Sequence, residues 1–260
     1  MRHAAGAACL VFISCSRLAA QSPNPSPAPA ADFFTRYAFH LSADALSVDD
    51  QRFSWDTHFG GELDVVDYVK GRTTILADYE AVLGDEYRPF DPNQAYYGLE
   101  VSSSYRLGQA EVAGVFHHVS RHLSDRPKRE PIAWNVLGAR ALRRSTIAGM
   151  TVDGRLEGGW IVQHSTVDYT WTGGVDLMIR RVVTPRVGGF LHGTGTLFGV
   201  DGTNPARGTQ RAGLFEAGVR FEGRAGVLEL FAGVERRIDA DPFDQLPLQW
   251  GIAGFRLLSK

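Results

Sequence analysis

The chain contains almost no cysteine. Only two of its 260 residues are cysteines, and both, Cys9 and Cys15, lie close to the N-terminus. Small exported soluble domains are often held together by disulfides. The rest of the chain has no thiol, so its fold must be stabilised without disulfides.

Long apolar runs and an excess of charge of one sign are also missing. Beyond the N-terminal segment, no stretch reaches the roughly 18 apolar residues that a membrane-spanning helix needs. The 27 basic and 29 acidic residues nearly cancel, so a nucleic-acid partner has no electrostatic support. Hydrophobic residues still make up 44% of the chain, and they must be distributed in short or alternating patterns.

The N-terminus has the features of an export signal. A short basic end, Arg2 and His3, precedes an apolar segment, and small residues lie before Gln21. This pattern predicts a signal peptide over residues 1–20. The segment Phe12 to Cys15 vaguely resembles a lipoprotein cleavage box, so the sequence leaves lipidation of Cys15 open. Residues 21–34, rich in proline and alanine, are expected to form a flexible tether before a domain over 35–260.

From Phe53 onward, apolar and polar residues alternate with a period of two. Phe53, Trp55 and Phe59 fall on one face, and Asp56 and His58 fall on the other. Such alternation is typical of β-strands with one apolar face. The pattern predicts strands near residues 53–65, 74–83, 97–106, 110–122, 133–143, 146–162, 169–182, 187–198, 212–222, 227–237 and 248–257. Most of these segments match the roughly 9–11 residues of a tilted membrane strand.

The polar face carries charges of both signs, as in the water-filled lumen of an outer-membrane barrel. These charged residues are Asp56, Glu62, Asp64, Asp78, Glu80, Glu100, Glu111, Arg140, Arg155, Glu157, Asp176, Arg180, Glu216, Arg220, Glu229 and Arg237. Aromatic residues near the strand ends are predicted to form interfacial girdles. They are Trp55, Tyr68, Tyr96, Tyr105, Trp134, Trp160, Tyr169, Trp171 and Trp250.

Short and long connections alternate along the chain. Short ones are predicted near Gly71, Gly108, Arg144, Pro185 and Gly223, with longer ones between them. Outer-membrane barrels have short periplasmic turns and longer external loops. With both termini in the periplasm, one more strand is needed near residues 37–46. The sequence therefore predicts an all-β protein, a closed antiparallel transmembrane barrel of about twelve strands in the outer membrane of a Gram-negative bacterium.

A polar group is predicted on the lipid-facing side of this barrel. Counting from an inward Glu111, the side chains of His118 and Ser120 point outward near the external end of a strand. Asn135 on the next strand lies roughly opposite them. Polar side chains that face lipid are costly unless they lie at the interface or have a role, so these residues form the candidate site.

The run from Phe116 to Asp125 resembles two groups of proteins. It looks like a family of uncharacterised outer-membrane barrels with a similar F-H-x-S-x-H-L-x-D run. More weakly, His118-Val119-Ser120 is similar to the H-x-S of lipid A 3-O-deacylases. That resemblance implies an esterase with Ser120 as nucleophile, His118 as base and Glu130 as the residue that orients the histidine. Asn135 and backbone amides are then candidate donors to the oxyanion.

Other interpretations remain open. His118 and Ser120 also suit an interfacial role in which they bind headgroups or loop backbone, in a barrel of structural, passive-transport or unknown function. The lumen carboxylates fit either a cation-selective pore or a salt-bridged plug. A zinc site through His118 and His122 is disfavoured because two pleats separate them by about 13 Å. We expect no cofactor and no metal, and outer-membrane lipids, including lipopolysaccharide, as partners; the sequence does not give the oligomeric state.

Overall fold

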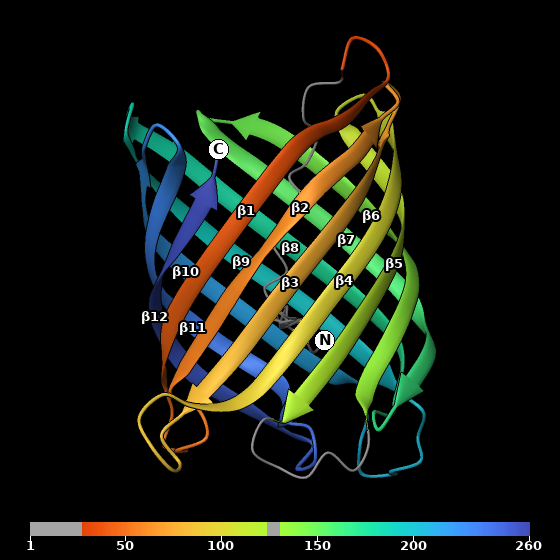
Figure 1. Ribbon diagram of the computed structural model, residues 1–260, viewed down its shortest axis with the longest axis vertical. Helices are drawn as coiled ribbons and strands as arrows, with labels where there is room; N and C mark the ends of the chain where they lie inside the picture. Colours follow the sequence, from red (N-terminus) through yellow and green to blue (C-terminus); the bar gives the residue numbers. More distant parts are fainter. Residues whose placement is uncertain (1–27, 124–130) are drawn as a thin grey trace, which may run out of the picture.

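The computed structural model describes residues 28–123 and 131–260, which form a closed barrel of twelve antiparallel strands (Figure 1). Each strand pairs with the next one along the chain, and β1 pairs with β12 to close the barrel. The predicted fold class is confirmed. The predicted signal peptide, the first half of the predicted tether (residues 21–27) and Glu130 lie outside the described residues.

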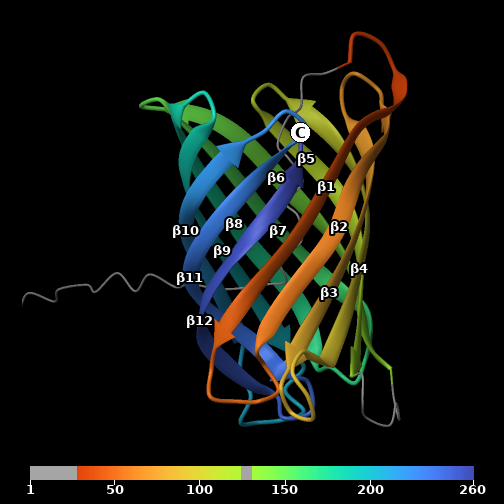
Figure 2. The same cartoon turned by 60° about the vertical axis from the view of Figure 1, so that its left-hand side comes forward.

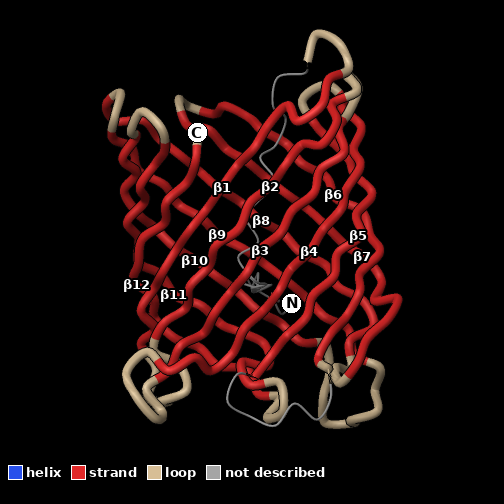
Figure 3. Tube along the Cα trace, in the orientation of Figure 1, coloured by secondary structure: helices blue, strands red, loops and turns tan. Residues whose placement is uncertain are grey.

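The strands account for nearly all of the tube in Figure 3. Their bounds are β1 (Asp32–Ser47), β2 (Trp55–Asp67), β3 (Arg72–Gly84), β4 (Asp91–Leu107), β5 (Ala110–Leu123), β6 (Ile132–Ile147), β7 (Met150–Ser165), β8 (Tyr169–Thr184), β9 (Val187–Val200), β10 (Gln210–Glu222), β11 (Gly226–Asp241) and β12 (Leu246–Ser259). β1 therefore begins within the range expected for the tether.

Two kinds of connection lie at opposite ends of the barrel. The turns at 108–109, 148–149 and 185–186 have two residues each, whereas the connections at 48–54 and 201–209 are longer. The C-terminus lies at the end with the short turns, which is the upper end in Figures 1 and 2. That end is periplasmic by the usual rule for such barrels, and the end with the longer loops is external.

The turn between β6 and β7 differs from the sequence prediction. A turn was expected near Arg144, but the strand continues to Ile147 and the turn residues are Ala148 and Gly149, both with positive φ. A two-residue hairpin with two positive φ angles is the favoured type I′ form. Arg144 remains within the strand because its guanidinium pairs with Asp153 of β7 at 2.6 Å.

The two faces of the sheet have the predicted character. Leu99 in β4 is 53% exposed on the outside, whereas its neighbour Glu100 is 3% exposed and points into the lumen. The outside of this barrel is apolar and its inside is charged, which is the reverse of a soluble barrel. This arrangement is typical of a barrel embedded in a lipid bilayer. No helix long and apolar enough to cross a membrane occurs among the described residues.

Four aromatic residues expected in the interfacial girdles lie in the lumen instead. Tyr96, Trp134, Tyr169 and Trp250 are all buried. Tyr96, Trp134 and Trp250 share the strand face of the inward charged residues, whereas Tyr169 has the parity of the outward Trp171 and turns inward at the register irregularity between the two. Each of the four is part of an apolar cluster inside the barrel. Buried tyrosine and tryptophan usually find a polar partner; here the Trp250 indole N–H donates to Glu235 at 3.1 Å. The prediction was wrong for Tyr96, Trp134 and Trp250 because it relied on their strand-end position and not on their parity. It was wrong for Tyr169 because an irregularity in β8 reverses the direction that parity would give.

Phe53 is a further correction. It was predicted on the apolar outer face, but β2 begins only at Trp55, so Phe53 lies in the preceding loop and does not follow the strand alternation. Its ring packs inside the barrel, 5.6 Å from the ring of Trp250. A loop residue is free to turn inward, and burial of its apolar ring favours that direction.

At the external end, side chains reach across the lumen. The end of β11 turns inward, with a register shift after Arg237 and a positive φ at Asp239. Arg121 of β5 donates to the carbonyl oxygens of Asp239 at 2.7 Å and Ala240 at 2.9 Å. Gln94 of β4 donates to the same Ala240 oxygen at 2.7 Å. Ala240 is 1% exposed, so these contacts close over the external part of the lumen.

Candidate functional site

The predicted site lies on the outer surface of β5 and β6. Along β5 the side chains of Arg121 and Leu123 are buried in the barrel, and His118 and Ser120 alternate with them on the outer face. Both are only partly exposed. Ser120 lies three residues before the end of β5, about 10 Å along the strand from the external loop. The site therefore faces the outer leaflet of the membrane.

A chain of hydrogen bonds orients His118. In the register of β5 and β6, His118 is directly opposite Asn135. The ring nitrogen Nδ1 of His118 donates to Oδ1 of Asn135 at 2.6 Å. The amide nitrogen of Asn135 donates in turn to Oε1 of Gln163 on β7 at 3.0 Å. This chain fixes the proton of His118 on Nδ1 and leaves Nε2 as a lone-pair acceptor.

Ser120 contacts a different histidine. Its Oγ shares a hydrogen bond of 3.1 Å with Nε2 of His122. The His122 ring in turn lies edge-on to the ring of Tyr97, with centroids 5.3 Å apart. The structure therefore brings Ser120, His118, Asn135 and His122 onto one patch, but Ser120 bonds His122 rather than His118. Glu130 lies outside the described residues.

Aromatic rings continue from this patch around the outside of the barrel. The Tyr97 ring is 5.1 Å from that of Tyr79, which is 5.0 Å from that of Phe59. These residues lie on the outward faces of β4, β3 and β2, so one side of the site is a continuous aromatic surface at the lipid boundary. Sequence reasoning missed this surface, and it also missed the contacts of Gln163 and His122. The outward parity of Tyr79 and Tyr97 was the available signal.

Among the described residues, the side chains of the outer patch form no group of three metal-ligating atoms. His118 bonds Asn135 through Nδ1, and His122 bonds Ser120 through Nε2. The two histidines are four residues apart on one strand, about 13 Å. They therefore do not converge on one ion.

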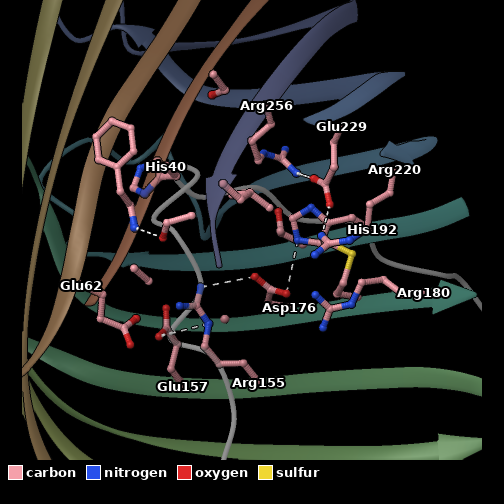
Figure 4. A pocket seen from close by; sticks show the side chains of 18 of the residues that line it. His40, Glu62, Arg155, Glu157, Asp176, Arg180, His192, Arg220, Glu229 and Arg256 are labelled. Atoms are coloured by element: carbon pink, nitrogen blue, oxygen red, sulfur yellow. Dashed lines mark hydrogen bonds and ion pairs between the residues drawn. The ribbon is translucent and has the colours of Figure 1, made fainter. Parts of the chain in front are cut away.

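A second polar region is a cavity of about 420 Å³ inside the barrel (Figure 4). It extends from Arg36 and Lys260 near the periplasmic end to His192 and Asp176 within the barrel. Ion pairs line it, including that between Arg256 and Glu229 at 3.0 Å on the neighbouring strands β12 and β11. His192 lies between two carboxylates, with Nε2 3.3 Å from Asp176 and Nδ1 3.0 Å from Glu216. The charges of the lumen thus pair with one another and form an ion-paired interior.

Comparisons with known proteins identify the fold and no family. No protein-family model matches the chain, and a comparison with curated protein sequences found no match. The two sequence resemblances at residues 116–125 therefore stay predictions.

Solved structures of bacterial outer-membrane barrels are similar to the chain. Outer membrane phospholipase A from Escherichia coli matches with a TM-score of 0.53 and 12% identity, over 86% of this chain and 92% of that one. An active-site mutant of the same enzyme, with an asparagine changed to alanine, matches with a TM-score of 0.52 and 12% identity, over 86% and 90%. An outer membrane channel from Pseudomonas putida F1 has a TM-score of 0.54 and 12% identity, over 92% and 98%.

An enzyme and a channel thus resemble the chain equally well, so the fold does not select between these functions. At 12% identity the likeness is one of architecture. A closed barrel with an apolar exterior and a charged, buried interior is typical of proteins that span the outer membrane. The chain is an integral β-barrel protein of the bacterial outer membrane.

Proposed function

We propose that the protein is a membrane-embedded esterase that hydrolyses an acyl ester of an outer-leaflet lipid. Ser120 is the nucleophile, His118 the general base, and Asn135 the residue that orients the base. The observation that carries the proposal is the 2.6 Å bond between His118 and Asn135 on a lipid-facing surface. A nucleophile, a base and a group that orients the base are the parts that hydrolysis by a serine enzyme requires.

The orientation of His118 favours it as the base. Oδ1 of Asn135 accepts a hydrogen bond from Nδ1–H of His118. Nε2 of His118 is then the nitrogen that can take a proton from a serine hydroxyl. Residues two apart on a strand share a face, with backbone positions about 6.5–7 Å apart. A change of the Ser120 rotamer away from His122 would bring its Oγ toward His118. Catalytic hydrogen bonds are often loose before substrate binds, so the resting contact with His122 is compatible with this role.

The structure limits which groups can stabilise the oxyanion. Asn135 uses its oxygen on His118 and its nitrogen on Gln163, so it has little left to offer a tetrahedral intermediate. His122 is the side chain whose Nε2 already lies 3.1 Å from Ser120 Oγ. We assign it as the side-chain donor to the oxyanion, beside backbone amides near the loop.

Two kinds of lipid fit this site. A substrate that diffuses laterally in the outer leaflet reaches an outward-facing serine without a deep pocket. The similar E. coli barrel is named a phospholipase, and one of its structures carries an active-site asparagine mutation. The His118-Val119-Ser120 motif resembles instead that of enzymes acting on lipid A. We therefore propose an acyl ester of a phospholipid or of lipopolysaccharide as the substrate class.

The closed external mouth also supports the esterase over passive transport. Contacts from Arg121 and Gln94 to the end of β11 cross the lumen, and the interior charges are ion-paired. These features hinder passage of solutes but do not affect chemistry on the outer surface.

The test is release of fatty acid by the refolded protein. Ser120→Ala should abolish release from phospholipid vesicles or from purified lipopolysaccharide, whichever the wild type cleaves. Ser102→Ala is the matched control, because Ser102 is a buried serine on the lumen side, and this variant should keep activity. Heat-modifiable mobility on a gel would show that both variants fold. No release from either lipid by the wild type, or full activity of Ser120→Ala, would contradict the proposal.

A further inference from the structure

A second cluster of chemically versatile side chains lies inside the barrel, on the opposite side of the wall from the lipid. Asp56 and His58 of β2 and Glu80 of β3 are buried, and His58 is 2% exposed. Each offers one ligand atom, and the three atoms lie within 4.8 Å of one another. A histidine nitrogen and two carboxylate oxygens are ligands that zinc accepts.

We propose that Asp56, His58 and Glu80 bind one zinc ion, with water as the fourth ligand. The sequence analysis predicted no metal, so this site is a departure from that expectation. Asp56 and His58 are two residues apart on one strand and therefore share a face, while Glu80 lies directly opposite His58 in the register of β2 and β3. The sheet thus places three ligands in one small area without any loop.

The contacts of His58 prepare its ring for a metal. Its Nδ1 donates to Oδ2 of Asp78 at 3.4 Å, and the other oxygen of Asp78 accepts from Nε2 of His40 at 2.6 Å. A carboxylate behind the ring fixes the tautomer and direction of a metal-binding histidine. The lone pair of Nε2 then points toward the cluster.

The Nε2 atom of His58 has no hydrogen-bond partner among the described residues. The nearby Oδ1 of Asp56 lies 3.5 Å away. Two atoms bound to one tetrahedral zinc at about 2.0–2.1 Å each would be roughly 3.4 Å apart. A neutral ring nitrogen and a carboxylate facing each other at this distance repel unless a positive charge lies between them.

The charges around the site favour a divalent cation. Arg237 of β11 pairs with Asp56, with Glu80 at 2.7 Å and with Glu235 at 3.1 Å. One guanidinium against three carboxylates leaves two negative charges in a buried region, where uncompensated charge is costly. A Zn²⁺ ion would balance them. Arg237 contacts Oδ2 of Asp56 and Oε1 of Glu80, and each carboxylate offers one ligand atom within 4.8 Å of the other ligand atoms.

The competing explanation is a doubly protonated His58 that pairs with Asp56 and Asp78 and needs no metal. Metal content separates the two explanations. The full chain would be stripped of metal with a chelator while unfolded and refolded in detergent with zinc. After removal of free zinc, elemental analysis should give one zinc per folded chain. Refolding with Co²⁺ should give the visible absorption of a four-coordinate site.

His58→Ala should lower the bound zinc at least tenfold. His192→Ala is the matched control: His192 is also in the lumen between two carboxylates, but both of its ring nitrogens are paired. That variant should keep the metal. Glu80→Gln, which keeps the side-chain size, should also lose it and serves if His58→Ala fails to fold.

Less than a tenth of an equivalent of zinc in the folded wild type would overturn the proposal in favour of a charged His58. Full zinc retention in both His58→Ala and Glu80→Gln, or loss in His192→Ala, would overturn it by placing the metal elsewhere. The site lies in the lumen, so these results are independent of the proposed chemistry at Ser120.

Discussion

Three polar residues on the lipid-facing side of β5, β6 and β7 are the most unusual feature of the molecule at the residue scale. Polar groups in contact with lipid are unfavourable unless they bond one another. His118, Asn135 and Gln163 do so in a chain that crosses three strands. The chain gives His118 a defined tautomer, which an interfacial residue that only contacts headgroups does not need.

The two histidines beside Ser120 should differ in their effect on hydrolysis. His118→Ala removes the base and should lower kcat by roughly 10²–10⁴-fold. His122→Ala removes a donor near the oxyanion and should lower kcat by a smaller factor. Rates of fatty-acid release at saturating lipid measure both effects. If His122→Ala proves the more damaging variant, the roles of the two histidines must be exchanged.

Strand alternation was enough to predict the outward direction of His118 and Ser120 and the position of Asn135 opposite them. It did not predict that Ser120 bonds His122. His118 and His122 are equally near Ser120 on the same strand face, and the side-chain rotamers decide which of them it bonds. Gln163 was missed for another reason. It follows a register irregularity of β7, between Ile161 and Gln163 and opposite Asn135 and Val136 of β6, and such a bulge cannot be placed by periodicity alone.

At the scale of the strands, the regular alternation made the sidedness of the barrel predictable, whereas the ends of strands were less so. The turn at Ala148 and Gly149 was missed because arginines within β6 resembled a connection. Tyr96, Trp134 and Trp250 were assigned by their position near strand ends, but their parity decides that they fill the lumen. Tyr169 fills it because of the irregularity before Trp171. Parity is therefore a better guide than position for aromatic residues in this barrel.

The sidedness gives a stability prediction for β4. Leu99 is at the middle of this strand and faces outward, and Ser102 faces the lumen. Leu99→Arg should reduce the free energy of unfolding in lipid by about 2–4 kcal/mol, the range for a charge near the bilayer midplane. Ser102→Arg should reduce it much less, because the lumen is polar. Equilibrium unfolding in urea with lipid vesicles measures both; equal losses would contradict the assigned faces.

At the scale of the whole molecule, the ion-paired lumen and the closed external mouth distinguish this barrel from an open pore. The wild-type protein should therefore give little steady conductance in a planar bilayer. Arg121→Ala removes two contacts to the end of β11, so it should increase the frequency of openings. A large, stable conductance from the wild type would show that the mouth opens in the membrane and would favour passive transport.

The architecture was predictable from sequence because the barrel repeats one simple pattern twelve times. Its function was not, because the same fold carries a phospholipase and a channel among its structural relatives. Function depends here on a few side chains, and their bonds arise from the register between strands that are distant in sequence. His118 and Asn135 meet only because β5 and β6 pair in one particular register.

If Ser120 is an activated nucleophile, a reagent that labels such serines covalently should modify it. The refolded protein would be treated with a fluorophosphonate, which reacts with activated serines, and the modified peptide identified by mass spectrometry. We expect a single adduct on Ser120 that is lost in His118→Ala, while Ser102 stays unmodified in both proteins. No adduct on Ser120 of a folded protein that reaches the lipid phase, or an equal adduct in His118→Ala, would contradict this expectation.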